Sequence, residues 1–201
     1  MTTHFGNADD KPTKAEKADK GDRLEEQLSF KSRFVLIFGE ITDALALSTC
    51  RRLLALAADS DAPITALISS PGGHVESGDA IHDMIRFIRA PVTTVGTGWV
   101  ASAGALIYCA AERDNRYCLP NTRFLLHEPR GGVGGMASDV EIQAREILRM
   151  RERLNQIFAT ATGQPVDKIK RDVDRDYWMM AEEAKAYGLV GKIVRSQNEI
   201  R

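Results

Sequence analysis

Ser102 combines a nucleophilic side chain with a position that could activate it. It lies in the segment Gly98-Trp-Val-Ala-Ser-Ala-Gly104, directly after a predicted strand and at the predicted start of a helix. A hydroxyl there lies near the positive end of the helix dipole, where backbone N–H groups can stabilise a developing anion. Serine also favours helix starts for capping alone, so the position by itself is better explained by an ordinary capping or packing serine.

A glycine turn, a histidine and an aspartate are the other candidates for this chemistry. The turn Ser70-Pro-Gly-Gly73 ends another predicted strand; it could present an amide to an oxyanion or simply connect strand to helix. His127 closes the apolar segment Phe124-Leu-Leu-His127, and Asp176 lies in the charged segment Asp174-Arg-Asp-Tyr-Trp178. A structural histidine and a solvated carboxylate explain these two residues, taken singly, at least as well as catalysis does.

Most other chemistries lack their motifs. The sequence contains no G-x4-G-K-[ST] loop, no H-E-x-x-H, no C-x2-C and no G-x-G-x-x-G after a strand, so we expect neither a bound cofactor nor a metal. The four histidines are scattered without ligand spacing, and the three cysteines, odd in number and irregularly spaced, fit a reducing compartment. Any use of ATP must therefore belong to another chain.

Charge and composition are those of a soluble globular protein. The 201 residues are 43% hydrophobic and 27% charged, and 27 basic against 28 acidic residues give a net charge of −1. This balance argues against nucleic-acid and membrane-surface binding, which favour a basic excess. The uncharged stretch 90–111 is long enough to span a bilayer, but its prolines, glycines and hydroxyls favour a buried strand and helix. With no targeting signal in the sequence, we expect a cytoplasmic protein.

Strands and helices alternate through most of the chain. Residues 1–23 are charge-mixed and poor in apolar groups, which predicts a disordered or weakly helical tail, and residues 24–201 should form one domain. We expect strands at 34–38, 64–68, 92–95, 123–126 and 189–194, with helices after the first three, one at 182–187, and a long helix ending at Gly163. Ser138-Asp-Val-Glu141 reads as the capping box of that long helix. The succession predicts an α/β fold whose largely parallel sheet is covered by helices.

The order and spacing of many short segments resemble one family closely, the proteolytic subunits of the Clp protease (ClpP). The segments that match, over about 34–194, are Ser70-Pro-Gly-Gly73, Ala101-Ser-Ala-Gly104, Leu119-Pro-Asn121, His127-Glu-Pro129, Gly131-Gly132, Glu146-Ile-Leu148, Glu152-Arg-Leu-Asn155, Thr162-Gly-Gln-Pro165, 172–176, Glu182-Glu-Ala184 and Tyr187-Gly-Leu189. The resemblance implies the ClpP/crotonase-like fold, in which helix 138–162 protrudes as a handle between rings. It also implies a serine endopeptidase that cleaves unfolded polypeptides.

The resemblance assigns roles to individual residues. Ser102 is implied as the nucleophile, His127 as the general base and Asp176 as the residue that orients it, the chemistry of a serine triad. The implied oxyanion donors are the backbone N–H groups of Gly73 and Ala103. The resemblance also implies a strand that binds the substrate, formed by Gly131, Gly132 and Val133. It further implies that Arg175 makes a contact between rings.

The same resemblance implies partners. Self or paralogous subunits would form two stacked heptameric rings, fed with unfolded polypeptide by a separate AAA+ ATPase. The chain departs from the family pattern at the tail, at Thr65 and Leu67 where aromatic docking residues are usual, and near the implied site. There Arg130 replaces an apolar residue, Glu128 replaces Gln, and His74 replaces Val, with no evident partner in sequence.

Two other functions remain open on the sequence. The chain could be a specialised paralogue, idle alone, that assembles with a standard subunit and modulates it, as the changed tail and docking positions suggest. It could also be a crotonase-type acyl-CoA enzyme, since that fold shares the oxyanion geometry. An acyl-CoA enzyme would not require His127 and Asp176 at the spacings that match Ser102. The presence of both residues therefore disfavours this hypothesis.

Overall fold

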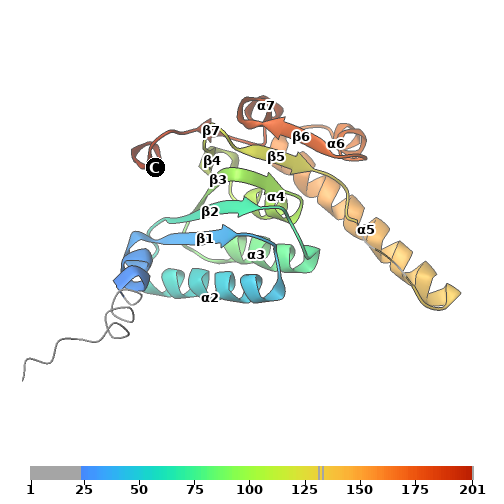
Figure 1. Cartoon of the computed structure of the whole chain (residues 1–201), viewed down its shortest axis with the longest axis horizontal. Helices are drawn as coiled ribbons and strands as arrows, with labels where there is room; N and C mark the ends of the chain where they lie inside the picture. The colour runs from blue at the N-terminus through green and yellow to red at the C-terminus, as the bar shows by residue number, and fades with distance from the viewer. Residues whose placement is uncertain (1–23, 131, 133, 201) are drawn as a thin grey trace, which may run out of the picture. The chain divides into compact units, whose positions relative to one another are not determined.

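The computed structural model describes residues 24–130, 132 and 134–200 (Figure 1). The predicted disordered tail at 1–23 lies outside the described residues. Contacts divide the chain into two units, 1–33 and 34–201. In the first, residues 24–32 are helical, although we expected the domain to begin at residue 24. The second unit holds the sheet and the site.

The second unit alternates strands and helices, as the apolar pattern predicts. The elements, in chain order, are β1 (Phe34–Phe38), α2 (Asp43–Asp59), β2 (Ile64–Ser70), α3 (Val75–Phe87), β3 (Val92–Ala101), α4 (Ala103–Tyr108), η1 (Arg113–Asn115), β4 (Arg116–Cys118), β5 (Arg123–Leu126), α5 (Ala137–Thr162), α6 (Val166–Asp172), β6 (Tyr177–Met180), α7 (Ala181–Tyr187), β7 (Lys192–Ile193) and η2 (Gln197–Glu199). The sequence pattern missed β4 and β6, which are short and carry charged or exposed residues.

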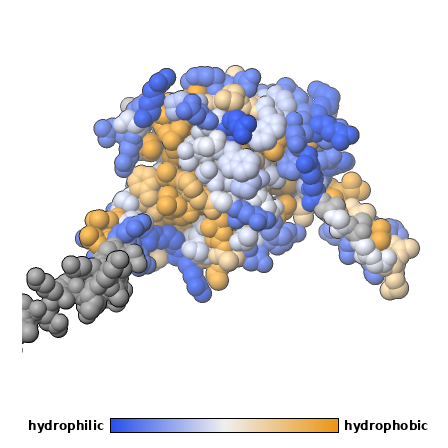
Figure 2. Space-filling view, viewed as in Figure 1, coloured by the Kyte–Doolittle hydropathy of each residue, from blue (hydrophilic) through white to orange (hydrophobic). Residues whose placement is uncertain are grey.

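The sheet is parallel except at one pair. Its order is β1-β2-β3-β4-β7, and β5 pairs with β3 on one side and with β6 on the other. Only β5 and β6 run antiparallel. One face packs on helices: Val35 and Ile37 of β1 are buried while Leu36, between them, is 60% exposed. Figure 2 shows apolar residues gathered on the viewer's side over β1 and β2, which agrees with an open second face.

The sheet forks at β3, and the fork positions the site. The first half of β3 pairs with β4, at Thr94 to Gly96, and the second half pairs with β5, at Trp99 to Ala101. Between them Gly98 has φ +61°, a conformation that glycine adopts without strain, so the strand can turn there. The register of β2 against β3 also shifts between Ile68 and Ser70. The uncharged stretch 90–111 is thus β3 and α4, a buried strand and helix as predicted.

The long helix α5 begins and packs differently from the prediction. Its N-cap is Met136 with no side-chain cap bond, so the predicted capping box at Ser138 is wrong: Ser138 already lies inside the helix. Gly163 ends the helix in the left-handed conformation, φ +74°, as expected. Burial is confined to its second half, at Leu154, Asn155, Phe158, Ala159 and Thr162. The first half projects from the sheet (Figure 1), as the handle of the implied fold does.

No helix in the described part of the chain combines the length and apolar character that a bilayer crossing requires.

Candidate active site

Ser102 occupies a sharp turn between β3 and α4. Its φ of +55° and ψ of −121° are unusual for a residue with a side chain, and such backbone strain, about 1–3 kcal/mol, concentrates at functional sites. The Ser102 hydroxyl makes no capping bond to α4, so the ordinary capping role is wrong. The Ser102 N–H instead donates to Leu125 O at 3.0 Å, which ties the turn to β5. The backbone of Ser102 is therefore held at the sheet edge.

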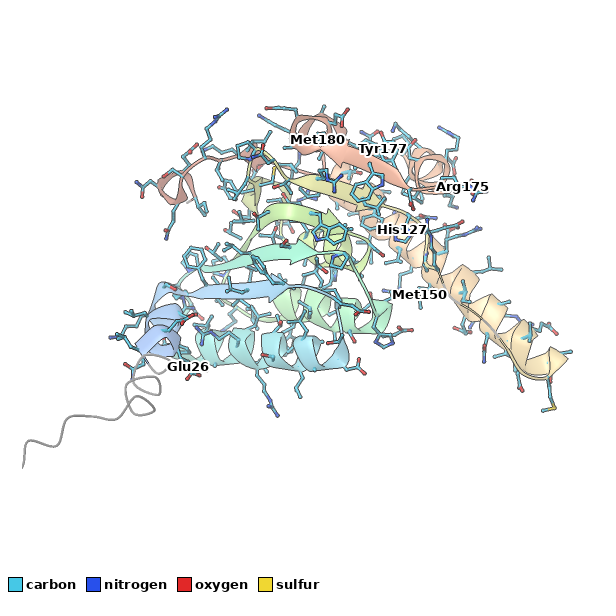
Figure 3. All side chains as sticks on the ribbon, viewed as in Figure 1. Glu26, His127, Met150, Arg175, Tyr177 and Met180 are labelled. Carbon is cyan, nitrogen blue, oxygen red and sulfur yellow. The ribbon has the colours of Figure 1, made fainter. Side chains whose placement is uncertain are left out.

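Strand register brings the three candidate residues to the same edge of the sheet. Ala101 pairs with Leu125 in β5, and Leu126 pairs with Tyr177 in β6. Ser102 and His127 follow the ends of parallel β3 and β5, and Asp176 precedes antiparallel β6. Residues just past the carboxyl ends of parallel strands meet at one edge, and the antiparallel pairing returns residue 176 to it. Figure 3 shows His127 here, with Arg175 and Tyr177 close by.

The three side chains do not make one continuous hydrogen-bonded chain. Ser102 and His127 line the same small hollow with Val75, Leu106, Leu154 and Phe158, whose volume of about 10 Å³ leaves room for one water at most. His127 Nδ1 lies 4.0 Å from Asp176 Oδ1, beyond hydrogen-bond range. Apart from Ser102 and His127, the hollow is lined by apolar side chains.

The electrostatics of His127 favour the neutral imidazole. Burial is the main cause of a lowered pKa, and the nearby charge of Arg130 lowers the pKa further. The carboxylates of Asp176 and Glu128 act in the opposite direction. Glu128 itself is paired with Arg151 of α5 at 3.2 Å. A neutral histidine is the form that can accept the proton of a serine hydroxyl.

The glycine turn packs directly against Ser102. A Cβ added to Gly72 would lie 2.6 Å from Ser102 Cβ. Ile41 N–H donates to Gly72 O and His74 N–H donates to Ile41 O, both at 2.8 Å. The bridge to Ile41 therefore uses the carbonyl before Gly73 and the amide after it, and not the N–H of Gly73 itself. Because successive amides in extended chain point to opposite sides, the Gly73 N–H points away from Ile41. The turn thus leaves one amide for a ligand.

The second implied oxyanion donor is Ala103. It is the first residue of α4, where the helix offers no carbonyl to its N–H. Its position directly after Ser102 places that amide beside the nucleophile, where the helix dipole also favours negative charge. The Gly73 and Ala103 amides are thus both without a partner in their own turn or helix, and their role as oxyanion donors stays a prediction.

His74 has partners that the sequence did not reveal. Its Nδ1 lies 3.1 Å from Asp43 Oδ1 and 2.8 Å from Ser77 Oγ, and its Nε2 lies 3.1 Å from Glu76. The Ser77 hydroxyl also donates to Asp43, and this bond, followed by that of His74, lowers the pKa of Asp43. The expectation of an unpartnered histidine was wrong: Asp43 is distant in sequence, and the start of α3 brings the nearby Glu76 and Ser77 side chains to the ring. The network ties the turn to the start of α2.

The remaining implied residues lie around this edge. Of the predicted substrate-binding strand, Gly131 and Val133 lie outside the described residues, and Gly132 is exposed and in no strand. Arg175, the implied contact between rings, is exposed and forms no ion pair within the described residues. Arg130 is the residue whose importance the sequence understated. Its guanidinium donates to Asp176 Oδ1.

The fold and the arrangement of serine, histidine, glycine turn and helix start define a serine peptidase of the Clp type. The sequence model of the family described as "Clp protease" matches residues 17–197. The chain therefore belongs to the Clp protease family, and it is a proteolytic subunit of the serine peptidase type.

Named relatives agree with this assignment. The chain is 63% identical to "ATP-dependent Clp protease proteolytic subunit 3" of Rhizobium meliloti (strain 1021), over 96% of this chain and 99% of that protein. It is 55% identical to "ATP-dependent Clp protease proteolytic subunit 2" of Pseudomonas aeruginosa, over 87% of each. The solved structure of ClpP1 from Listeria monocytogenes is 49% identical and superposes with a TM-score of 0.81, covering 89% of this chain and 99% of that one.

Proposed function

We propose that Ser102, His127 and Asp176 cleave peptide bonds as a serine triad. His127 takes the proton of the Ser102 hydroxyl as the oxygen attacks the scissile carbonyl, then passes it to the leaving amine. Asp176 stabilises the imidazolium formed in between. The single observation that carries this proposal is the strained Ser102, which lines one hollow with the largely buried His127 at the edge where Asp176 also lies.

The amides of Gly73 and Ala103 are the proposed oxyanion donors. During attack the carbonyl oxygen becomes negative, and two N–H groups directed at it stabilise that charge in the transition state. Gly73 has its amide turned from the Ile41 bridge, and Ala103 has no carbonyl partner in its helix. Neither donor requires a side chain, which agrees with a turn rich in glycine.

The assembly and the energy source form the second part of the proposal. We propose stacked heptameric rings of this chain or of a paralogue, with unfolded polypeptide delivered by a separate AAA+ ATPase and no cofactor held by this chain. The exposed first half of α5 supports a contact between rings, since Ile142 and Leu148 are 57% and 54% exposed there. Exposed apolar residues on a projecting helix favour association.

The alternative proposal, a subunit idle until it joins a paralogue, has its own support. The relatives above carry the numbers 3 and 2 in their names, which is the naming of one subunit among several. The 4.0 Å gap between His127 and Asp176 fits a subunit whose site is completed by assembly. Under this proposal the same triad acts, but only in the mixed particle.

Labelling of the purified protein with a fluorophosphonate tests the triad directly. This reagent phosphonylates an activated serine, so we expect one adduct on Ser102 in the wild type and none in Ser102→Ala. Native mass measurement of both proteins should give the same particle, which excludes loss of assembly as the cause. Absence of labelling in the assembled particle, both alone and mixed with a paralogue, would refute the proposal. Labelling only in the mixture would favour the idle subunit.

A further inference from the structure

One carboxylate oxygen of Asp176 has two neighbours competing for it. Arg130 Nη2 donates to Asp176 Oδ1, and the same oxygen is the one nearest to His127 Nδ1, 4.0 Å away. A hydrogen bond to the imidazole would need an N···O distance of about 2.7–3.2 Å. Asp176 is thus bound to Arg130 and not to His127.

His127 is left with an unsatisfied nitrogen. Its Nδ1 is buried and has no hydrogen-bond partner within the described residues. A buried polar atom without a partner is unfavourable, and such exceptions concentrate at sites that change state. In a serine triad the bond from Nδ1–H to a carboxylate fixes the tautomer that leaves the other ring nitrogen free to accept a proton. The missing bond is the one the reaction requires.

We propose that Arg130 is a positioning residue that restrains the reaction by holding Asp176 away from His127, so that the triad is completed only when Arg130 releases the carboxylate. The proposal rests on the triad proposed above. Three observations carry it together: the Arg130–Asp176 ion pair, the 4.0 Å gap and the orphaned Nδ1.

The geometry allows the release. The Arg130 side chain is 65% exposed and that of Asp176 is 42% exposed, and ion pairs in water contribute little free energy. The imidazole, by contrast, is only 12% exposed, and a bond formed there is less screened. Closing about 1 Å between His127 and Asp176 needs a change of side-chain rotamer, not of fold. The ion pair with Arg130 is therefore weak enough to exchange.

The charge of Arg130 acts on His127 in the same direction. It lowers the pKa of the imidazole, whereas the Asp176 and Glu128 carboxylates raise it. Release would bring the negative Asp176 closer and the positive Arg130 farther away. Both changes raise the pKa of His127, so release of Asp176 by Arg130 should be accompanied by a higher pKa of this histidine.

The test compares Arg130→Met with the wild type. Met keeps an unbranched side chain of similar reach but removes the donor and the charge. We expect fluorophosphonate labelling of Ser102 to be about tenfold faster, the gain from one regained charge-assisted hydrogen bond. Arg130→Lys, which keeps a cation, should stay close to the wild type. Arg89→Met is the matched control, since Arg89 pairs with Asp61 at 3.4 Å, away from the site, and 83% of its side chain is exposed.

A second measurement does not depend on activity. NMR of isotope-labelled histidine in the Ser102→Ala background follows His127 directly, and only four histidines must be resolved. Adding Arg130→Met should raise the pKa of His127, whereas Arg89→Met should not shift it. An unchanged or lowered pKa in Arg130→Met overturns the inference, as does slower labelling, which would make Arg130 a support of the triad. A raised pKa in a protein that never labels would reject the triad, and with it the restraint on catalysis, and would leave only an electrostatic contact between Arg130 and the imidazole.

Discussion

The contact between the glycine turn and Ser102 predicts a large loss of activity from one added methyl group. In Gly72→Ala the new Cβ would lie 2.6 Å from Ser102 Cβ and 3.1 Å from Ala101 O. Carbon atoms pack favourably at about 3.5–4.0 Å, so the turn or the serine must move by about 1 Å. Ser102 has little freedom to move, because its strained backbone is tied to Leu125.

The displacement should appear in the chemical step. The turn carries the proposed oxyanion donor Gly73, and loss of one such donor costs roughly 10²–10³ in rate. A misplacement of about 1 Å has an effect of similar size, about 10². We therefore expect kcat/KM for a fluorogenic peptide to fall by about 10²–10³ in Gly72→Ala, with a parallel loss of fluorophosphonate labelling.

Gly39→Ala separates this collision from backbone strain. Gly39 has φ +85°, close to the +98° of Gly72, but nothing lies within 4 Å of its added Cβ. Both variants should lose stability by about 1–2 kcal/mol from the left-handed conformation alone, measured by thermal unfolding. Only Gly72→Ala should lose activity. Wild-type kcat/KM in Gly72→Ala, or an equal loss in Gly39→Ala, would refute the reasoning.

Two further predictions concern the pKa of His127 and the ion pair between Arg153 of α5 and Asp79 of α3. The pKa of His127 is lowered, mainly by burial, and the base must be neutral to act, so the acidic limb of kcat/KM against pH should have its midpoint below 6.5; a midpoint above that value would contradict the buried geometry. Arg153 donates two bonds of 2.6 Å to Asp79 of α3, so Arg153→Met should lower the free energy of unfolding by about 1–2 kcal/mol in urea, after allowance for its half-exposed side chain. Arg149→Met removes only an exposed ion pair within α5, so it should change the free energy of unfolding by less than about 0.5 kcal/mol. Equal losses in both variants would show that the contact between α5 and α3 contributes nothing to stability.

The local sequence pattern predicted the type of most helices and strands correctly, but it did not predict where they begin and end. The apolar runs at 34–38 and 123–126 are strands, and the helix that follows the first of them begins with a side-chain cap, in which Leu45 N–H donates to the Thr42 hydroxyl at 3.2 Å. The capping box at Ser138 failed because α5 starts before it at Ala137. A capping box describes four residues and takes no account of the chain that precedes them.

Burial was less predictable than helicity. In α2, Leu54 is 44% exposed, whereas Leu56, two residues further on, is fully buried. In α5 the apolar stripe continues past the core, so its first half has no fully buried residue against the described part of the chain. Periodicity shows which residues share a face, but only the neighbouring elements decide how much of that face is covered.

The amino-acid sequence alone determined the α/β class, the succession of most elements and, through its motifs, the family to which the chain belongs. These properties depend on residue types and short spacings, which local backbone and side-chain preferences translate directly into structure. Tertiary structure decided how Ser102, His127 and Asp176 meet, because the fork in β3 and the antiparallel β6 are set by pairings between distant segments. It also decided that Asp176 binds Arg130, since competition for one carboxylate oxygen depends on distances of a few ångströms that no spacing along the chain encodes.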